Sequence, residues 1–388
     1  MPSPSVSVSR TPSQSAPWSS VRTSTQICDS RWVGYSSKIV SLQLRPTVPV
    51  MKTIFSIDRI KVCLLQPEGF FDKLYQLYQL VPGRERKVIN YDGYYLSFEK
   101  AEHVNDKDIT AELFLGGAVK LGCFTFNKSM KYGSKCFFVF ETKSLYEVSG
   151  YTFDKDGGRV KVNYFSYPFN VFEDLGLQFN NVTSIEIACD TEARVYSGIQ
   201  YAVSHPDVFE MVLLGRKVKD PNAILEGYGE YYQRTRLTKR LPRPTIYIRP
   251  VHPERGNNRE LKVYDKAREL LQSRPDKKDL QEAWLGMGDR VQRMEISVQN
   301  KQFQQFFDRM RRQYPDRWEG LEHFFYDLGQ DETIRFLMFD YFAESLLHFR
   351  VRNHDKKHLS ICDLTVNSTA TLRRLAKMKC KPRGKSAQ

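Results

Sequence analysis

The segment Ser-Ile-Glu-Ile-Ala-Cys-Asp (Ser184–Asp190) alternates polar and apolar residues. Successive side chains of a β-strand point to opposite faces of its sheet, so Glu186 and Asp190 share one face. Ile185 and Ile187 face the other side, where they can join a hydrophobic core. The segment therefore predicts a half-buried strand with two carboxylates on its polar face.

Two later segments repeat this alternation. The polar face of Leu261–Lys266 carries Lys262, Tyr264 and Lys266. The polar face of Arg293–Val298 carries Arg293, Glu295 and Ser297, while Met294, Ile296 and Val298 face the other side. A tyrosine between lysines and a third carboxylate are thereby added to the polar faces of neighbouring strand candidates.

The segments around these three predict an α+β fold built on antiparallel sheet, because strands and helices do not alternate regularly. Further strands are predicted at Thr53–Leu65, Tyr94–Glu99, Glu112–Val119, Lys120–Phe126, Lys135–Glu141, Val160–Phe165 and Thr245–Arg249. Helical spacing of apolar residues predicts helices at Pro67–Val81, near Val171–Phe179, and at Glu192–Ser204, Gln302–Gln313, Trp318–Leu328 and Asp331–Val351. We expect an α+β domain over residues 51–300 and a helical extension over 301–365.

The chain has 388 residues, and its net charge of +14 lies mostly at its ends. The first fifty residues hold five basic residues and one acid, and residues 366–388 hold seven basic residues and no acid. Residues 1–50 are rich in Ser and Pro and lack periodicity, which predicts a disordered leader. A transit peptide shares this composition, whereas the strand that follows Met51 favours an extension upstream of the natural start. Residues 366–388 are predicted to be a basic disordered tail.

Apolar runs and cysteine usage indicate the cellular compartment in which the protein is expected. The sequence holds no apolar run of the roughly 20 residues that a membrane span needs, so no membrane partner is expected. Its seven cysteines are scattered without a C-x-x-C pair. Reduced thiols in the cytoplasm are therefore expected rather than a disulfide framework or a zinc site.

The polar strand faces hold groups that suit phosphodiester chemistry. Carboxylates are the ligands that Mg²⁺ or Mn²⁺ prefers, and Glu186, Asp190 and Glu295 are the candidates. A tyrosine hydroxyl is a poor nucleophile at neutral pH unless a metal or cations favour its ionised form. Lys262 and Lys266 are the cations nearest Tyr264 in sequence. Each residue also has an ordinary structural interpretation. Asp190 could cap the following helix, and Glu186 and Glu295 could form cross-strand ion pairs with lysines. Tyr264 is one of 21 tyrosines in the chain.

The order of the segments along the chain favours the functional interpretation over the ordinary structural ones. Ser184–Asp190, then Thr245–Arg249, Leu261–Glu269 and Arg293–Ser297 resemble the replication initiation factor family, the Rep-trans type of rolling-circle initiator found in small plasmids and filamentous phages. The resemblance covers about residues 182–300. Two positions depart from the family pattern. Glu186 stands where an Asp is frequent, and Arg249-Pro250 stands where a Gly-Ser pair is common.

The resemblance implies a metal-dependent DNA-nicking and joining enzyme. Tyr264 matches its nucleophile, Lys266 its lysine and Glu269 the acid that follows. Glu186, Asp190 and Glu295 fall at the carboxylate positions that would serve a Mg²⁺ or Mn²⁺ site. The implied partners are origin DNA, double-stranded and as a hairpin or single strand, and a host helicase and polymerase, with a homodimer also possible.

A basic segment precedes the Tyr264 strand. Between Gln233 and Pro253 there is no acid, and the segment holds Arg234, Arg236, Lys239, Arg240, Arg243 and Arg249. Such a cluster favours contact with a DNA backbone, although a solvated loop has the same composition. Two other functions stay open: a non-catalytic DNA-binding regulator on the same fold, and a site-specific recombinase. The recombinase is disfavoured because its chemistry needs Arg and His on helices.

Overall fold

The structure is a computed structural model of the chain. It describes residues 52–79, 87–91, 94–98, 108–115, 119–127, 135–146, 150–153, 159–162, 164–221, 231–233, 236–238, 241–250, 259–267, 269, 291–315, 321–352, 358–366 and 372–373. The chain divides into two units, Met1–Val50 and Met51–Gln388. The leader expected over residues 1–50 and nearly all of the tail expected over 366–388 lie outside the described residues. The second unit is described below.

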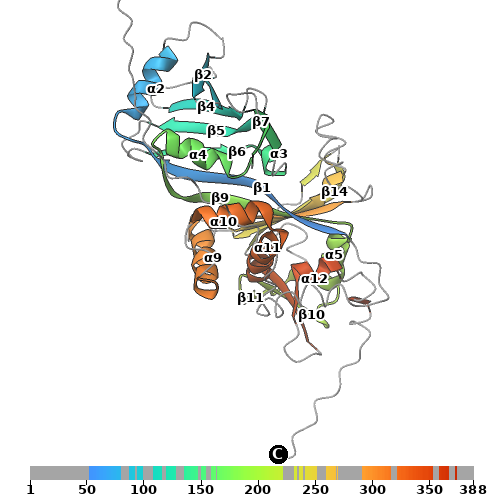
Figure 1. Ribbon diagram of the computed structural model, residues 1–388. Coiled ribbons are helices and arrows are strands. Elements are labelled where there is room, and N and C mark those ends of the chain that lie inside the picture. Colours follow the sequence, from blue (N-terminus) through green and yellow to red (C-terminus); the bar gives the residue numbers. More distant parts are fainter. Residues whose placement is uncertain are drawn as a thin grey trace, which may run out of the picture. The chain divides into compact units, whose positions relative to one another are not determined.

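A 12-stranded antiparallel sheet dominates this unit (Figure 1). Its order is β12-β14-β15-β16-β9-β1-β6-β5-β4-β3-β2, and β13 pairs with β14. The strands are β1 Thr53–Leu65, β2 Lys87–Tyr91, β3 Tyr94–Phe98, β4 Asp108–Leu115, β5 Val119–Asn127, β6 Lys135–Phe140, β9 Gln178–Thr191, β12 Tyr231–Gln233, β13 Arg236–Thr238, β14 Leu241–Pro250, β15 Glu260–Asp265 and β16 Gln292–Gln299. With the helices described next, the sheet confirms the predicted α+β class.

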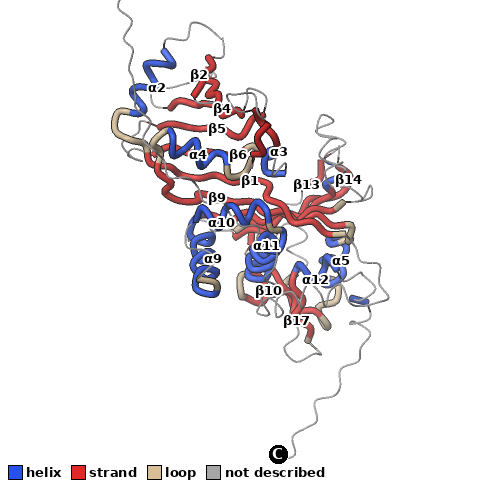
Figure 2. The backbone as a smooth tube through the Cα atoms, viewed as in Figure 1, coloured by secondary structure: helices blue, strands red, loops and turns tan. Residues whose placement is uncertain are grey.

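The long strands β1 and β9 join two halves of the sheet. They pair with each other along their whole lengths, whereas β6 pairs only with Lys61–Leu65 of β1. On the opposite side, β16 pairs only with Ser184–Thr191 of β9. Figure 2 shows both strands running through the two halves. We call the halves the β6 half and the β16 half.

Phenylalanine side chains fill the core of the β6 half. Phe124 and Phe138 lie on adjacent strands with ring centroids 4.6 Å apart, and Phe138 lies 5.1 Å from Phe172 of helix α4 (Tyr167–Asp174). Helix α2 (Phe70–Gln79) adds Phe70 above Phe126, and the short helix α3 (Thr142–Tyr146) follows β6. This burial of large aromatic rings contributes strongly to stability.

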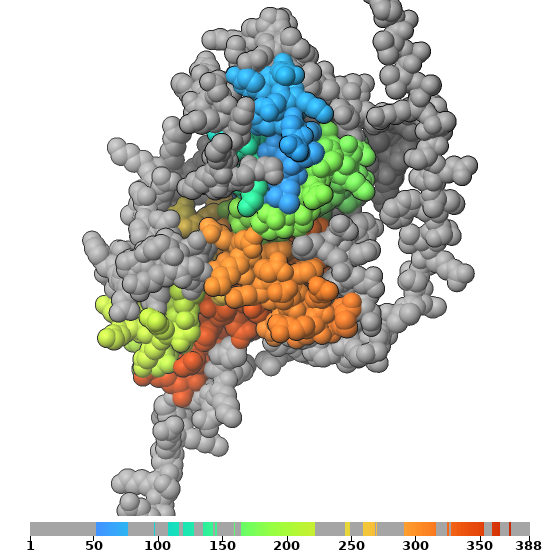
Figure 3. All heavy atoms as spheres, turned by 90° about the vertical axis from the view of Figure 1, so that its left-hand side faces the viewer, coloured from blue at the N-terminus to red at the C-terminus, as the bar shows by residue number. Residues whose placement is uncertain are grey.

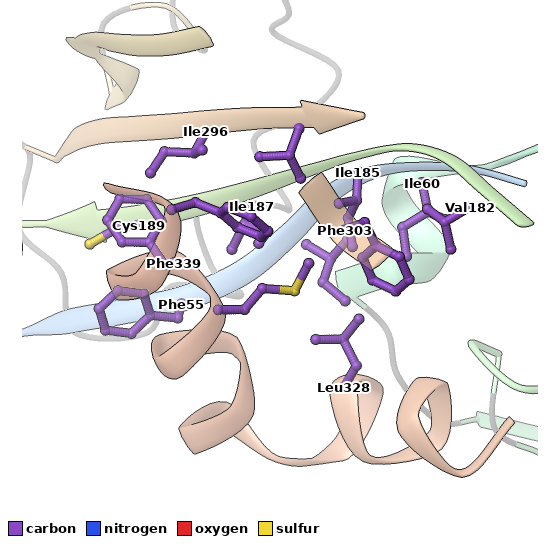
Figure 4. Packing of buried hydrophobic residues seen from close by; sticks show 14 of the residues in the cluster. Phe55, Ile60, Val182, Ile185, Ile187, Cys189, Ile296, Phe303, Leu328 and Phe339 are labelled. Carbon is purple, nitrogen blue, oxygen red and sulfur yellow. The ribbon is translucent and has the colours of Figure 1, made fainter. Parts of the chain in front are cut away.

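Three helices cover the apolar face of the β16 half: α9 Asn300–Gln313, α10 Leu321–Gln330 and α11 Glu332–Leu346. Figure 4 shows Phe303, Leu328 and Phe339 from these helices in the same hydrophobic cluster as Ile185, Ile187 and Ile296 of the sheet. Phe325 of α10 also contacts Phe169 of the β6 half, so one hydrophobic core underlies both halves. The helices expected at the C-terminal side therefore share the core of the sheet.

Segments of α2, α4 and α9, coloured blue, green and orange, follow one another on the face seen in Figure 3. Helices α2 and α4 belong to the β6 half, and α9 belongs to the β16 half. Among the described helices, none combines the length and apolar character that crossing a membrane requires.

A second sheet has the order β11-β10-β17-β18. Its strands are β10 Phe209–Leu213, β11 Arg216–Lys217, β17 Leu347–Val351 and β18 His358–Ser360, and helices α5 Val195–Val203 and α12 Ile361–Val366 flank them. Strands β7 Gly150–Phe153 and β8 Arg159–Val162 form a separate hairpin.

The structure corrects two of the predicted helices. The helix expected at Asp331–Val351 stops at Leu346, because Leu347, Phe349 and Val351 alternate inward as β17 and pair with β10. The helix expected near Val171–Phe179 is α4, which ends at Asp174. Gly176 then adopts a φ of 69°, a conformation that favours glycine, and reverses the chain into β9.

Strand β5 approaches β6 so closely that Gly122 has no room for a side chain. A Cβ at this position would overlap the ring of Phe138 and the carbonyl oxygen of Val139. Gly122→Ala is expected to lower the free energy of unfolding by about 1–3 kcal/mol, measured by urea denaturation. Gly198→Ala in α5 is the matched control, because its nearest contact would be Leu372 Cδ1 at 3.6 Å and alanine favours helices. Equal losses in both variants would contradict this packing.

Candidate active site

The register of four strands assembles the predicted polar residues on one face. The strands β15, β16, β9 and β1 lie side by side, and directly opposed residues form rows across them. The rows are Tyr264–Arg293–Asp190, Lys262–Glu295–Ala188–Ser56 and Glu260–Ser297–Glu186–Arg59. The predicted tyrosine, lysines and carboxylates are therefore neighbours, on the face opposite α9, α10 and α11.

A β-bulge in β1 adds a residue that the sequence interpretation did not include. Ile57 pairs with Ile187 and Arg59 pairs with Glu186, so Asp58 is an extra residue in β1. Bulges often lie beside active sites and redirect one side chain. Asp58 Oδ1 accepts a hydrogen bond from Arg293 Nη1 at 2.7 Å, which places the Asp58 carboxylate among the polar rows.

Among the described residues, three carboxylates converge in one group. One oxygen each of Asp58, Glu186 and Glu295 lies within 4.8 Å of the others. Glu186 and Glu295 are two of the three carboxylates expected from the sequence. Asp58 is the third member, and its visible sequence signal is the alternation of Ser56 and Asp58 with Phe55 and Ile57.

Asp190, the remaining carboxylate expected at a metal site, lies outside this group. Its Oδ1 and Oδ2 accept hydrogen bonds from Arg293 Nε and Nη2, both at 2.7 Å. The Asp190 side chain has no exposed surface, and that of Arg293 is 1% exposed. The structure therefore places Asp190 in a buried bidentate ion pair instead of bringing it to Glu186 and Glu295.

Tyr264 joins the carboxylate group through its hydroxyl, which donates a hydrogen bond to Glu295 Oε1. Lys266 Nζ donates to the Tyr264 hydroxyl oxygen at 3.5 Å and forms an ion pair with Glu269 at 2.6 Å. Burial raises the pKa of Tyr264 well above its ordinary value of 10.0, and the charge of Glu295 raises it further. In the metal-free site, Tyr264 is thus a protonated hydrogen-bond donor.

Lys262 lies among the carboxylates. Its ammonium is 3.4 Å from Glu295 Oε2, 3.8 Å from Glu186 Oε2 and 3.8 Å from Glu260 Oε1. Burial by itself would lower the pKa of Lys262, but the charges of Glu295, Glu186 and Glu260 outweigh burial and raise it. These ion pairs make Lys262 a counter-ion for the carboxylate group rather than a direct partner of the Tyr264 hydroxyl.

Glu186 shows the opposite balance. Burial raises its pKa above 4.5, Lys262 opposes this, and the charges of Glu295 and Asp58 add to the increase. The ionised form of Glu186 is therefore held in place at a cost in stability. Perturbed pKa values of this kind cluster at functional sites and also occur in structural networks of ion pairs.

The donor set fits Mg²⁺ or Mn²⁺. Both ions prefer oxygen ligands, and carboxylates supply them with compensating charge. One carboxylate oxygen from each of Asp58, Glu186 and Glu295 lies within 4.8 Å of the others, so the three residues together could hold such an ion. The resident cation, Lys262, would have to withdraw from Glu186 and Glu295.

The basic segment expected to contact DNA is described only in part. Arg236 lies in β13 opposite Thr245, Arg249 lies in β14 opposite Tyr232, and Arg243 also belongs to β14. Arg234, Lys239 and Arg240 lie outside the described residues. Strand β14 pairs with β15, so this segment adjoins the strand that carries Tyr264.

Glu186→Gln is expected to stabilise the metal-free protein at pH 7. The raised pKa means that ionised Glu186 opposes folding at neutral pH, and this cost disappears as the pH falls through the raised value toward 4.5. Thermal unfolding of the variant and the wild type should therefore differ at pH 7 and converge as the pH approaches 4.5. Glu260→Gln, which removes a partner of Lys262 outside the group, should give no stabilisation at pH 7. A lower unfolding temperature for Glu186→Gln at pH 7 would contradict this assignment.

Comparison with known proteins gives one structural similarity to report. No protein-family model matches the chain, and no curated protein matches it. A solved structure of the rolling circle replication initiator protein from Geobacillus stearothermophilus aligns with 79% of this chain and 90% of that chain. The identity is 10% and the TM-score is 0.34.

Proposed function

We propose that this protein is a rolling-circle replication initiator, which binds an origin, cuts one DNA strand through Tyr264 with the help of a divalent metal, and rejoins it. One observation carries the proposal. The Tyr264 hydroxyl donates to Glu295, and Glu295 belongs to the group formed with Asp58 and Glu186. A nucleophile and a metal site that share one carboxylate suit phosphoryl transfer.

In this proposal Asp58, Glu186 and Glu295 hold Mg²⁺ or Mn²⁺. When bound, such an ion polarises a phosphodiester and offsets the charge that develops during displacement. Lys262 forms ion pairs with Glu186 and Glu295, and a bound ion would take over the balancing of these charges. Lys262 would then be released toward the DNA phosphate, where an ammonium is a suitable partner.

The chemical step exchanges one phosphate ester for another. The Tyr264 oxygen forms a bond to phosphorus, its proton passes to Glu295, and the bond from phosphorus to the 3′ oxygen breaks. That oxygen takes the proton that Glu295 received from Tyr264 and leaves as a free 3′ hydroxyl, while the 5′ phosphate remains on Tyr264. Lys266, at 3.5 Å from the tyrosine oxygen, supports its negative charge during attack and again when rejoining releases it.

The remaining parts of the proposal follow from this activity. Arg234, Arg236, Lys239, Arg240, Arg243 and Arg249 would contact the origin backbone beside the Tyr264 strand. The 3′ hydroxyl would be extended by a host polymerase, and a host helicase would separate the strands. The setting would be the cytoplasm of a cell that carries a plasmid or phage, with a homodimer as a possible assembly.

A second candidate is a DNA-binding regulator that does not cut. The observation in its favour is that burial and the charge of Glu295 raise the pKa of the Tyr264 hydroxyl, which disfavours the ionised form that a nucleophile needs. The regulator would bind DNA without a metal and without forming a covalent link. A measurement of covalent adduct formation with DNA therefore distinguishes the two candidates.

Tyr264→Phe is expected to abolish a covalent DNA adduct, because the variant keeps the ring and loses the nucleophilic oxygen. The probe is a set of overlapping fragments of the DNA that flanks the protein's own gene, carried on supercoiled plasmids and incubated with Mn²⁺. Nicking and adduct formation are read on denaturing gels. The wild type should form the adduct, and the loss in Tyr264→Phe should exceed about 1,000-fold.

Tyr247→Phe is the matched control for this experiment. Tyr247 lies on β14 directly opposite Lys262, so the control changes a tyrosine of the neighbouring strand. It should retain adduct formation. An adduct formed by Tyr264→Phe would refute the nucleophile assignment, and DNA binding without nicking by the wild type would favour the regulator.

Asp58→Asn is expected to weaken Mn²⁺ binding, because it replaces a carboxylate of the group by a neutral amide. The loss should exceed the roughly 10–100-fold typical of residues that only support a ligand. Isothermal titration calorimetry without DNA measures the affinity. Glu260→Gln is the control, because Glu260 lies next to the group and forms an ion pair with Lys262, as Glu186 and Glu295 do. This variant should bind Mn²⁺ as the wild type does. Unchanged affinity in Asp58→Asn would remove Asp58 from the metal site.

A further inference from the structure

We infer that Arg293 is the positioning residue of the metal site, and that Asp190 holds Arg293 in place. The inference rests on the proposed function, because it concerns the same carboxylate group. It assigns to Asp190, which the sequence indicated as a metal ligand, a different role: Asp190 acts on the site through an arginine.

The Arg293 side chain connects the buried carboxylate of Asp190 to the group of three carboxylates. Nε and Nη2 each donate to one oxygen of Asp190 at 2.7 Å, and Nη1 donates to Asp58 Oδ1 at 2.7 Å. Nη1 also lies 3.7 Å from Glu295 Oε1. Asp190 therefore holds one side of the planar guanidinium, and the other side contacts Asp58 and Glu295, two of the three carboxylates of the group.

The location of Asp58 explains why such a contact is needed. Asp58 is the extra residue of a bulge, where the regular ladder of β1 and β9 is interrupted, so the ladder alone does not determine its direction. The hydrogen bond from Nη1 supplies that constraint. Glu186 and Glu295, by contrast, lie at regular register positions of β9 and β16.

Arginine suits this role better than lysine. Its rigid fork binds both oxygens of Asp190 and still directs Nη1 to a second carboxylate, whereas an ammonium has no fixed plane. A buried ion pair is weak evidence for stability. The extension of the pair to Asp58 and Glu295, rather than the pair alone, points to a role at the site.

The test compares Arg293 with Arg335, a second arginine that makes several hydrogen bonds within the protein. Arg293→Lys keeps a positive charge and removes the fork. Arg335→Lys is the control, because Arg335 is a half-buried arginine whose hydrogen bonds go to the backbone oxygens of Phe55, Leu328 and Gly329 instead of to carboxylates. Mn²⁺ affinity is measured by calorimetry without DNA, and thermal unfolding is measured without metal.

Arg293→Lys should weaken Mn²⁺ binding by about 10–100-fold, the range found for groups that orient metal ligands. Arg335→Lys should lower the unfolding temperature and keep the wild-type affinity. Wild-type affinity in folded Arg293→Lys would overturn the inference, as would an equal loss in Arg335→Lys. If Arg293→Lys does not fold, Asp190→Asn provides the measurement. It keeps the shape of the anchor, removes its charge, and should also weaken Mn²⁺ binding by at least about 10-fold.

The outcomes separate this inference from the proposed function. If the wild type binds neither Mn²⁺ nor Mg²⁺, the proposed metal site itself fails. If the wild type binds Mn²⁺, Asp58→Asn does not, and both Arg293→Lys and Asp190→Asn bind it normally, only the role of Arg293 is refuted.

Discussion

The pairing of β1 with β9 is the constraint on which the rest of the structure depends. These strands run through both halves of the sheet, and one face of the pair must be apolar to pack under α11. Alternation then sends the polar side chains to the opposite face. In the β16 half, that face gathers charge from β15, β16, β9 and β1. The site is thus built on hydrogen-bonded strands, which hold side chains more precisely than loops do. Asp58 is the exception, because it is a bulge residue on the part of β1 that pairs with β9 alone.

Charge on this face is balanced in two layers. In the buried layer, Arg293 lies between Asp190 and Asp58, with hydrogen bonds of 2.7 Å to both. In the more exposed layer, Lys262 lies 3.4 to 3.8 Å from three glutamates, a looser arrangement. The tight pairs resist rearrangement because breaking a buried pair leaves an uncompensated charge. In the proposed enzyme, Lys262 is therefore the cation that a bound metal would replace.

The sequence could predict the faces but not the alignment of the strands. Alternation was enough to place Glu186, Tyr264 and Glu295 on polar strand faces, and the α+β class followed from the same pattern. The pairing of Arg293 with Asp190 depends on which residues of β16 and β9 stand opposite each other, and that register is a tertiary property. The bulge at Asp58 was hidden for a similar reason, since a single extra residue leaves no clear mark on a pattern of short period. At Leu347–Val351, the spacing of apolar residues predicted a helix, but this segment forms a strand because it pairs with β10.

The state of Tyr264 follows from these two layers. Its pKa is raised by burial and by Glu295, and Arg293 only partly offsets this, so the metal-free site protects the hydroxyl against ionisation. A cation held by Glu295 would withdraw the negative charge that raises the pKa, and would do so at the carboxylate to which the hydroxyl donates. Burial alone would still oppose ionisation, which is why Lys266 beside the tyrosine oxygen matters. In the proposed enzyme, a bound metal and Lys266 would therefore both favour the ionised form of the Tyr264 hydroxyl.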